Sequence, residues 1–140
     1  MTYKSTTIES LLAGDPSGRL RALHDQLVGL GLKTKMVRNS DTLLFEAITV
    51  ERERVGVAAI RGGNTEVLSF PRPYWVRHVS ELDDALRTIE ERHLVSPEGF
   101  VSSSQYSLRQ VRVSSDTAAQ LQAIVSDLVC RHVRSITNDA

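Results

Sequence analysis

The chain has 140 residues, of which 41% are hydrophobic and 24% charged, and its 17 Lys and Arg balance 17 Asp and Glu. This length suits a single domain with its own buried core. The balanced charge gives no global field that would draw the whole chain to nucleic acid or to an anionic membrane. Its apolar runs fall short of the roughly 18 residues of a membrane span. The first residues also lack the apolar core of a signal peptide, so a cytoplasmic location is expected.

Helical periodicity comes first along the chain. Thr6 and Glu9 have the spacing of a capping box at the start of a short helix. Asp15–Pro16 is typical of the N-cap and first residue of a second helix. That helix is predicted to end at Gly29–Gly31, and its apolar face carries Leu20, Leu23, Leu27 and Leu30.

From residue 32 the hydrophobic period changes to two, which indicates strands. The predicted strands span residues 33–38, 42–50, 55–60 and 65–70. Gly62–Gly63 between the last two favours a type I′ hairpin, because both residues take positive φ at little cost. All the connections are short, whereas a parallel crossover needs a dozen or more residues, so the strands are expected to form an antiparallel meander.

A third helix is expected after residue 79, with Ser80 as its N-cap and Asp83 as the reciprocal partner. Ser96 to Gly99 ends it. One more strand is predicted near residues 106–113, and a last helix begins at about Asp116. We expect a single domain over 1–140, in which 6–94 forms a core and 95–140 an extension.

These elements predict an α+β fold, an antiparallel β-meander of four or five strands with N-terminal, middle and long C-terminal helices packed on one face. The last helix, about 20 residues and roughly 30 Å long, is long for so small a sheet. Part of it is therefore expected to pack against a second copy, as in a homodimer. The inner positions of the sheet are predicted to include Leu43, Phe45, Val57, Ala59, Leu68 and Phe70.

Residues 65–79 contain the only tryptophan and two of the four prolines. Their aromatic side chains either close the core or line a surface on which a partner docks. Our first functional hypothesis is a non-catalytic interaction module that binds a protein or a ligand through residues 70–77. The candidate binding residues are Arg72, Tyr74, Trp75 and Arg77.

A nucleic-acid-binding domain is the alternative. Tyr74 and Trp75 would supply a stacking platform beside basic residues, although Lys33 and Lys35 also suit a protected edge strand. The candidate basic surface consists of Lys33, Lys35, Arg52, Arg54 and Arg61.

No catalytic, metal-binding or cofactor-binding pattern is found. A restriction-type nuclease needs an acid on one strand and an acid-x-Lys on the next, and neither Asp41 nor Glu46 has such a partner. Cys130 is the only cysteine, which excludes an intramolecular disulfide and a cysteine-based zinc site. The four histidines are scattered, and Glu90–His93 is a single Glu-x-x-His match without the second copy that a helical-bundle metal site requires. A nuclease-like hydrolase is thus the least favoured alternative.

The segments TIESLLAGDPSGRLRALHDQLVGLGLKTK, TLLFEAI, VGVAAI, TEVLSF and HVSELDDALRTIEE carry a resemblance. Together they resemble a group of small bacterial α+β domains of unknown function and, more distantly, the helix–meander–helix layout of MmcQ/YjbR-like domains. The resemblance covers about residues 6–94 and brings no catalytic residue with it. It implies a fold, and it argues against an enzyme.

Overall fold

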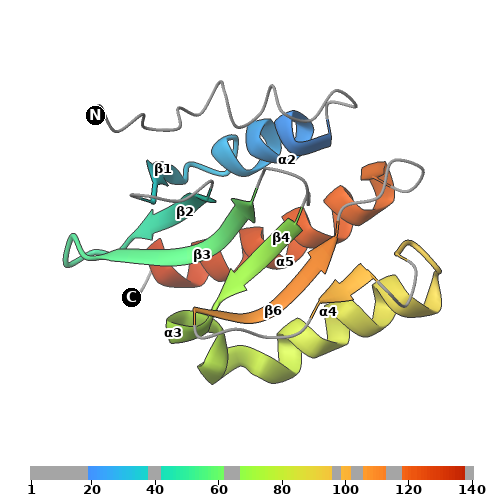
Figure 1. The fold of residues 1–140 in the computed structure, drawn as a ribbon. Helices are drawn as coiled ribbons and strands as arrows, with labels where there is room; N and C mark the ends of the chain where they lie inside the picture. Colours follow the sequence, from blue (N-terminus) through green and yellow to red (C-terminus); the bar gives the residue numbers. More distant parts are fainter. Residues whose placement is uncertain are drawn as a thin grey trace, which may run out of the picture.

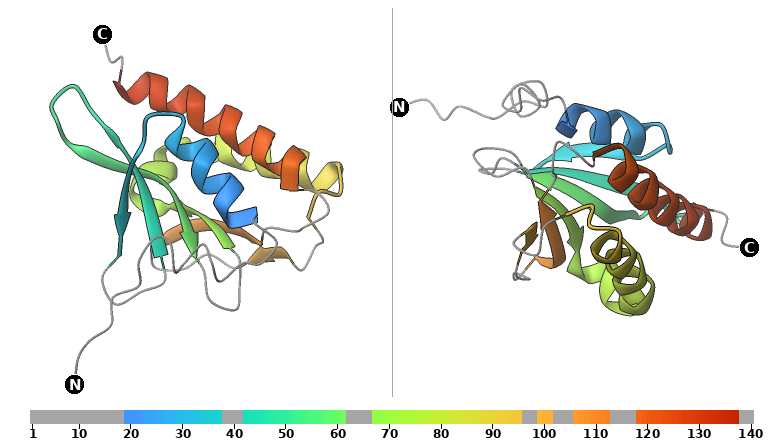
Figure 2. Two further views of the ribbon diagram at one scale, coloured as in Figure 1. Left: turned by 90° about the horizontal axis from the view of Figure 1, so that it is seen from above. Right: turned by 90° about the vertical axis from the view of Figure 1, so that its right-hand side faces the viewer.

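The computed structural model describes residues 19–37, 42–61, 67–95, 99–101, 106–112 and 118–137. These residues form one six-stranded antiparallel sheet in the order β1-β2-β3-β4-β6-β5, with helices on one of its faces (Figures 1 and 2). The strands are β1 (Lys33–Met36), β2 (Thr42–Ile48), β3 (Arg54–Arg61), β4 (Val67–Pro71), β5 (Phe100–Val101) and β6 (Ser107–Arg112). The helices are α2 (Arg19–Val28), α3 (Arg72–Trp75), η1 (Val76–His78), α4 (Val79–Glu91) and α5 (Ala118–Thr137).

The predicted α+β class is confirmed, as are the antiparallel sheet, the helices on one face and the long C-terminal helix. The sheet differs from a pure meander at one end, since β6 pairs with β4 and the two-residue β5 lies at the edge beyond it. The predicted helix at Thr6, the turn at 38–41 and the turn at Gly62–Gly63 lie outside the described residues.

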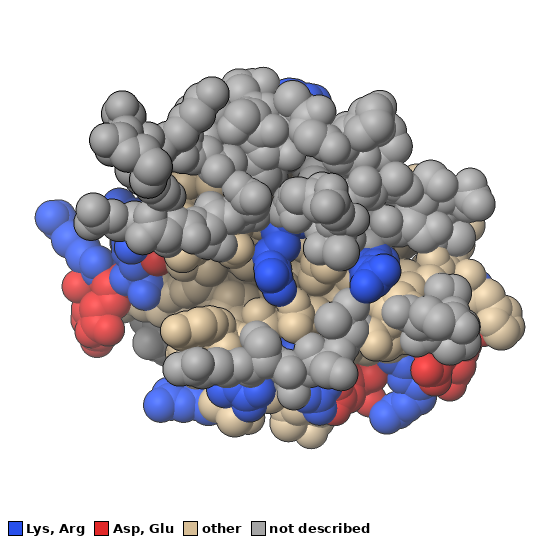
Figure 3. All heavy atoms as spheres, in the orientation of Figure 1, with Lys and Arg blue, Asp and Glu red and all other residues tan. Residues whose placement is uncertain are grey.

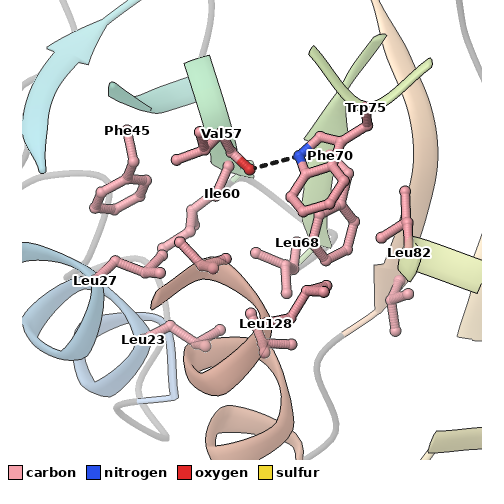
Figure 4. Close-up of a cluster of buried hydrophobic side chains, with 14 of the residues drawn as sticks. Leu23, Leu27, Phe45, Val57, Ile60, Leu68, Phe70, Trp75, Leu82 and Leu128 are labelled. Carbon is pink, nitrogen blue, oxygen red and sulfur yellow. Dashed lines mark hydrogen bonds between the residues drawn. The ribbon is translucent and has the colours of Figure 1, made fainter. Parts of the chain in front are cut away.

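One hydrophobic core lies between the sheet and the helices, and both halves of the chain contribute to it (Figure 4). Leu43 and Phe45 enter it from the sheet, and Leu121 and Leu128 enter it from α5. The predicted inner positions are all buried, but Ala59 pairs with Leu44 and Ser69 on the opposite face of the sheet. The register of β2 and β3 shifts at Phe45/Glu46, and such a bulge interrupts the alternation that placed Ala59 inside.

Residues 72–78 lie between a predicted strand and a predicted helix, and they are themselves helical. Proline's fixed φ suits the first turn of a helix, and Pro73 occupies that turn of α3. η1 then leads directly into α4, which begins at Val79 with no side-chain hydrogen bond at its N-terminus. The predicted cap at Ser80 is therefore wrong, because η1 already precedes α4 and Asp83 is bonded to Arg109 instead.

The length of α5 has an explanation within one chain. Its 20 residues contact α2, α4, β2 and β3, so it crosses most of the helical layer. Contacts within one chain are thus sufficient to explain its length without a second copy. Among the described residues, no helix is both long enough and apolar enough to cross a membrane.

Candidate functional site

Trp75 belongs to the core. Its side chain is fully buried, its indole N–H donates to the carbonyl oxygen of Val57 at 2.8 Å, and its ring meets the ring of Phe70 edge-on (Figure 4). The backbone N–H of Arg72 donates to the carbonyl oxygen of Tyr106 at 2.9 Å, and Arg77 is exposed. The structure thus removes Trp75 from the predicted docking surface.

Tyr74 leads to a buried histidine. The Tyr74 hydroxyl lies 2.6 Å from Nδ1 of His132 on α5, whose side chain is 4% exposed. Nε2 of His132 lies 2.7 Å from Oε2 of Glu81 in the first turn of α4. This separation is that of an ion pair, although Nε2 meets no described group in the geometry of a hydrogen bond.

His78 completes the group. Its ring stacks on Tyr74 with centroids 4.7 Å apart, and its Nδ1 lies 3.7 Å from Oε1 of Glu81. The ring of Trp75 lies 4.6 Å from that of His132. We call Tyr74, His78, Glu81 and His132 the tyrosine–histidine cluster.

Burial governs the acid–base chemistry of this cluster. Burial, followed by the charge of the Glu81 carboxylate, raises the pKa of Tyr74 to about 12. It also lowers the pKa of His132, an effect that Glu81 opposes. A tyrosine that holds its proton so firmly is not an activated nucleophile at neutral pH. The Tyr74 hydroxyl therefore keeps its proton and serves as a hydrogen-bonding group.

The sequence did not reveal this cluster. Tyr74 and His132 are 58 residues apart, and the histidines were judged scattered. One local signal was available, since His78 and Glu81 are three residues apart at the predicted start of a helix, although His78 lies before the predicted cap at Ser80. One ligand atom from each of His78, Glu81 and His132 lies within 4.8 Å of the others, so these residues are placed to hold a metal ion.

A hollow of about 430 Å³ opens between α4 and α5. Glu81 lines it together with Arg131, whose Nε lies 3.5 Å from Oδ2 of Asp127. The hollow therefore gives solvent a path to the carboxylate of the cluster.

The opposite face of the sheet is basic. Residues directly paired across antiparallel strands share a face, and Lys35 pairs with Leu44, Leu44 with Ala59, and Ala59 with Ser69. Residues two positions along each strand share that face as well. It therefore carries the exposed side chains of Lys33, Lys35, Arg61 and Arg112, which we call the basic sheet face.

Figure 3 views the molecule from this side, with Lys and Arg across the middle and Asp and Glu at the left and lower right edges. Arg54 is also on this side, but it is held by the buried Glu46 at 3.3 Å, and Arg52 lies in the β2–β3 turn with φ 66°. Tyr74 lies with the helices, so the predicted stacking platform beside the basic residues is wrong.

The nuclease alternative gains no support from Glu46. Its side chain is buried and its Oε1 accepts a hydrogen bond from Arg54, which leaves it unsuited to a metal site open to substrate. Asp41 lies outside the described residues.

No family model, curated protein or solved structure matches this chain. The resemblance to small bacterial α+β domains stays a prediction.

Proposed function

We propose that this chain is a non-catalytic nucleic-acid-binding domain that holds a phosphate backbone against the basic sheet face. The observation that carries this proposal is the register, which places Lys33, Lys35, Arg61 and Arg112 on one face. All four are exposed, and none forms an ion pair with another described residue. Phosphate contacts by such side chains supply most of the sequence-independent affinity for nucleic acid.

The distribution of charge supports this function despite the zero net charge. Residues 1–79 contain 11 Lys and Arg against 8 Asp and Glu, and residues 80–140 contain 6 against 9. Many of the acids lie on α4, namely Glu81, Asp83, Asp84, Glu90 and Glu91. Because α4 lies on the other side of the sheet (Figure 2), we expect the field over the basic sheet face to be positive.

Binding by this surface depends on phosphates rather than on base stacking, since Tyr74 and Trp75 lie on the helical side. The domain is therefore expected to bind DNA or RNA with little sequence preference.

The test is fluorescence anisotropy with a short labelled duplex over a range of salt concentrations. Four phosphate contacts predict a slope of about −3 to −4 in log affinity against log salt. The double variants Lys33→Glu/Lys35→Glu and Arg61→Glu/Arg112→Glu should each weaken binding by at least about 10-fold. The matched control is Arg77→Glu/Arg87→Glu, which makes the same charge change on the helical side and should bind as the wild type does.

Absence of binding at low salt, or equal losses in the test and control variants, would contradict the proposal. A loss confined to the Arg77 control would favour the interaction module at residues 70–77 instead. The exposed surface that remains for such a module includes Arg77 and Val76, which is 52% exposed. Tyr106, whose backbone bonds to Arg72, is 75% exposed.

A further inference from the structure

We propose that His78, Glu81 and His132 bind a zinc ion, with Tyr74 as the outer partner that orients His132. The site lies among the helices, on the side of the sheet opposite the basic sheet face. It therefore stands or fails independently of nucleic-acid binding.

The first argument is the distance between the ligand atoms. Nε2 of His132 is 2.7 Å from Oε2 of Glu81, and Nδ1 of His78 is 3.7 Å from Oε1 of the same carboxylate. Ligand atoms about 2.0–2.1 Å from a tetrahedral zinc ion are about 3.3 Å from one another. The observed separations, to the two oxygens of one carboxylate, lie on either side of that value, and one ligand atom from each of the three residues lies within 4.8 Å of the others. Side-chain rotations then bring the three residues onto one ion.

The second argument is the state of His132. This side chain is 4% exposed, and its Nε2 forms no hydrogen bond with a described group although Oε2 of Glu81 lies 2.7 Å away. A buried polar nitrogen without a hydrogen bond is rare in native proteins and calls for a partner. A metal ion at Nε2 supplies that partner and also joins the nitrogen to Glu81.

The third argument is the outer partner. Zinc-binding histidines almost always donate their second ring N–H to an oxygen, which fixes the tautomer and the ring orientation. Nδ1 of His132 lies 2.6 Å from the Tyr74 hydroxyl, which can accept this bond. Nδ1, which would not bind the metal, is thus already bonded to Tyr74, and Nε2 is left to face the ion.

The donor set selects the metal. Two imidazole nitrogens and one carboxylate oxygen are typical of zinc sites that keep an open position, whereas magnesium and calcium prefer oxygen ligands alone. Glu81 is exposed on one side and lines the hollow between α4 and α5, so solvent reaches the ion from there. Water then occupies the remaining position.

The protein also carries its own probe and its own control. Trp75 is the only tryptophan, and its ring lies 4.6 Å from that of His132, so a bound paramagnetic ion such as cobalt(II) will quench its fluorescence. Glu90 and His93 repeat the i,i+3 spacing of His78 and Glu81 at the other end of α4, where both side chains are exposed.

The experiment is a titration of EDTA-treated protein with zinc chloride by calorimetry, and with cobalt(II) by Trp75 fluorescence. We expect one ion per chain, a rise in thermal stability with zinc concentration, and no effect of magnesium. His78→Asn/Glu81→Gln should weaken zinc binding by more than about 100-fold, and Tyr74→Phe by about 10- to 100-fold. Glu90→Gln/His93→Asn should leave binding unchanged.

His78 is half-buried and Glu81 is exposed, so the variants at these positions should fold. Circular dichroism will check this. Failure of the wild type to bind zinc stoichiometrically would overturn the proposal. Zinc binding that survives in His78→Asn/Glu81→Gln, or that is lost in Glu90→Gln/His93→Asn, would overturn it equally.

Discussion

Trp75 connects the segment before α4 to the middle of the sheet. Its indole N–H bonds to the Val57 carbonyl oxygen at 2.8 Å, and its ring fills the space beside Phe70 (Figure 4). Trp75→Phe removes the donor and leaves a cavity, so the free energy of unfolding should fall by about 2–3 kcal/mol. Chemical denaturation followed by circular dichroism measures the loss.

Arg77→Ala is the control for this prediction, because Arg77 is exposed two residues further on. A surface substitution of this kind is expected to change stability by no more than about 0.5 kcal/mol. Free access of acrylamide to Trp75 in the wild type would show that the side chain is not in the core.

Tyr74 offers a test of burial through its ionisation. In metal-free protein one tyrosine should ionise with a pKa of about 12 instead of the usual 10.0, because burial and Glu81 disfavour the phenolate. Between these values the unfolded chain has lost the proton and the folded chain keeps it. The stabilisation is therefore fully present below pH 10 and is lost as the pH rises through 12.

Spectrophotometric titration of tyrosinate checks this prediction. The part of the tyrosinate absorbance that appears near pH 12 should be absent in Tyr74→Phe. If that part persists in the variant, it would belong to another tyrosine.

At the scale of elements, one ion pair ties α4 to β6. Arg109 donates from Nε to Oδ1 of Asp83 at 2.9 Å and from Nη2 to Oδ2 at 3.2 Å, with both side chains nearly two-thirds buried at 37% and 39% exposed. A double-mutant cycle with alanine should give a coupling of about 0.5–1 kcal/mol that decreases in high salt.

Asp84 and Arg87 provide the matched pair for this cycle. Their single contact of 3.1 Å lies within α4, and the side chain of Arg87 is 62% and that of Asp84 69% exposed. The coupling between them should therefore be about 0.2–0.5 kcal/mol. A coupling for Asp83–Arg109 no larger than this would show that the bidentate geometry adds nothing.

The elements predicted from the sequence are those with a long local signal. β1 to β4 and the apolar stripes of α4 and α5 follow from hydrophobic periodicity, which is a property of neighbouring residues. α3 has four residues, too few to show a period, and Pro71 before it and Pro73 within it indicate a turn as readily as a first helical turn. The start of α4 was misplaced because η1, with three residues, is also too short to show a period. Ser80 has the side chain of a cap whether or not η1 precedes it.

The candidate sites depend on pairing between distant segments, and periodicity carries no information about it. Lys33 and Lys35 share a side of one strand because they are two residues apart. Arg112 joined them only through the register of β6 with β4. His132 meets Glu81 because α5 packs against α4, a contact that no spacing in the sequence specifies.

For the whole molecule, the surface of α5 bears on its state of association. Protein interfaces are depleted of charge at their centres and enriched in large apolar side chains. The exposed residues of α5 include Gln120, Ala123, Asp127, Arg131 and Arg134, and none is a large apolar residue. We therefore expect the chain to sediment as a monomer of 15.5 kDa, independent of concentration.

A dimer could also form through the exposed edge of the sheet. The composition of that edge argues against such a dimer. β1 is an edge strand of four residues, and its Lys33 and Lys35 are exposed. Short, lysine-bearing edges resist pairing with another copy. If the sedimentation coefficient does rise with concentration, two variants distinguish the interfaces. Lys35→Val should strengthen association through β1 and leave association through α5 unchanged. Arg131→Glu should affect only association through α5.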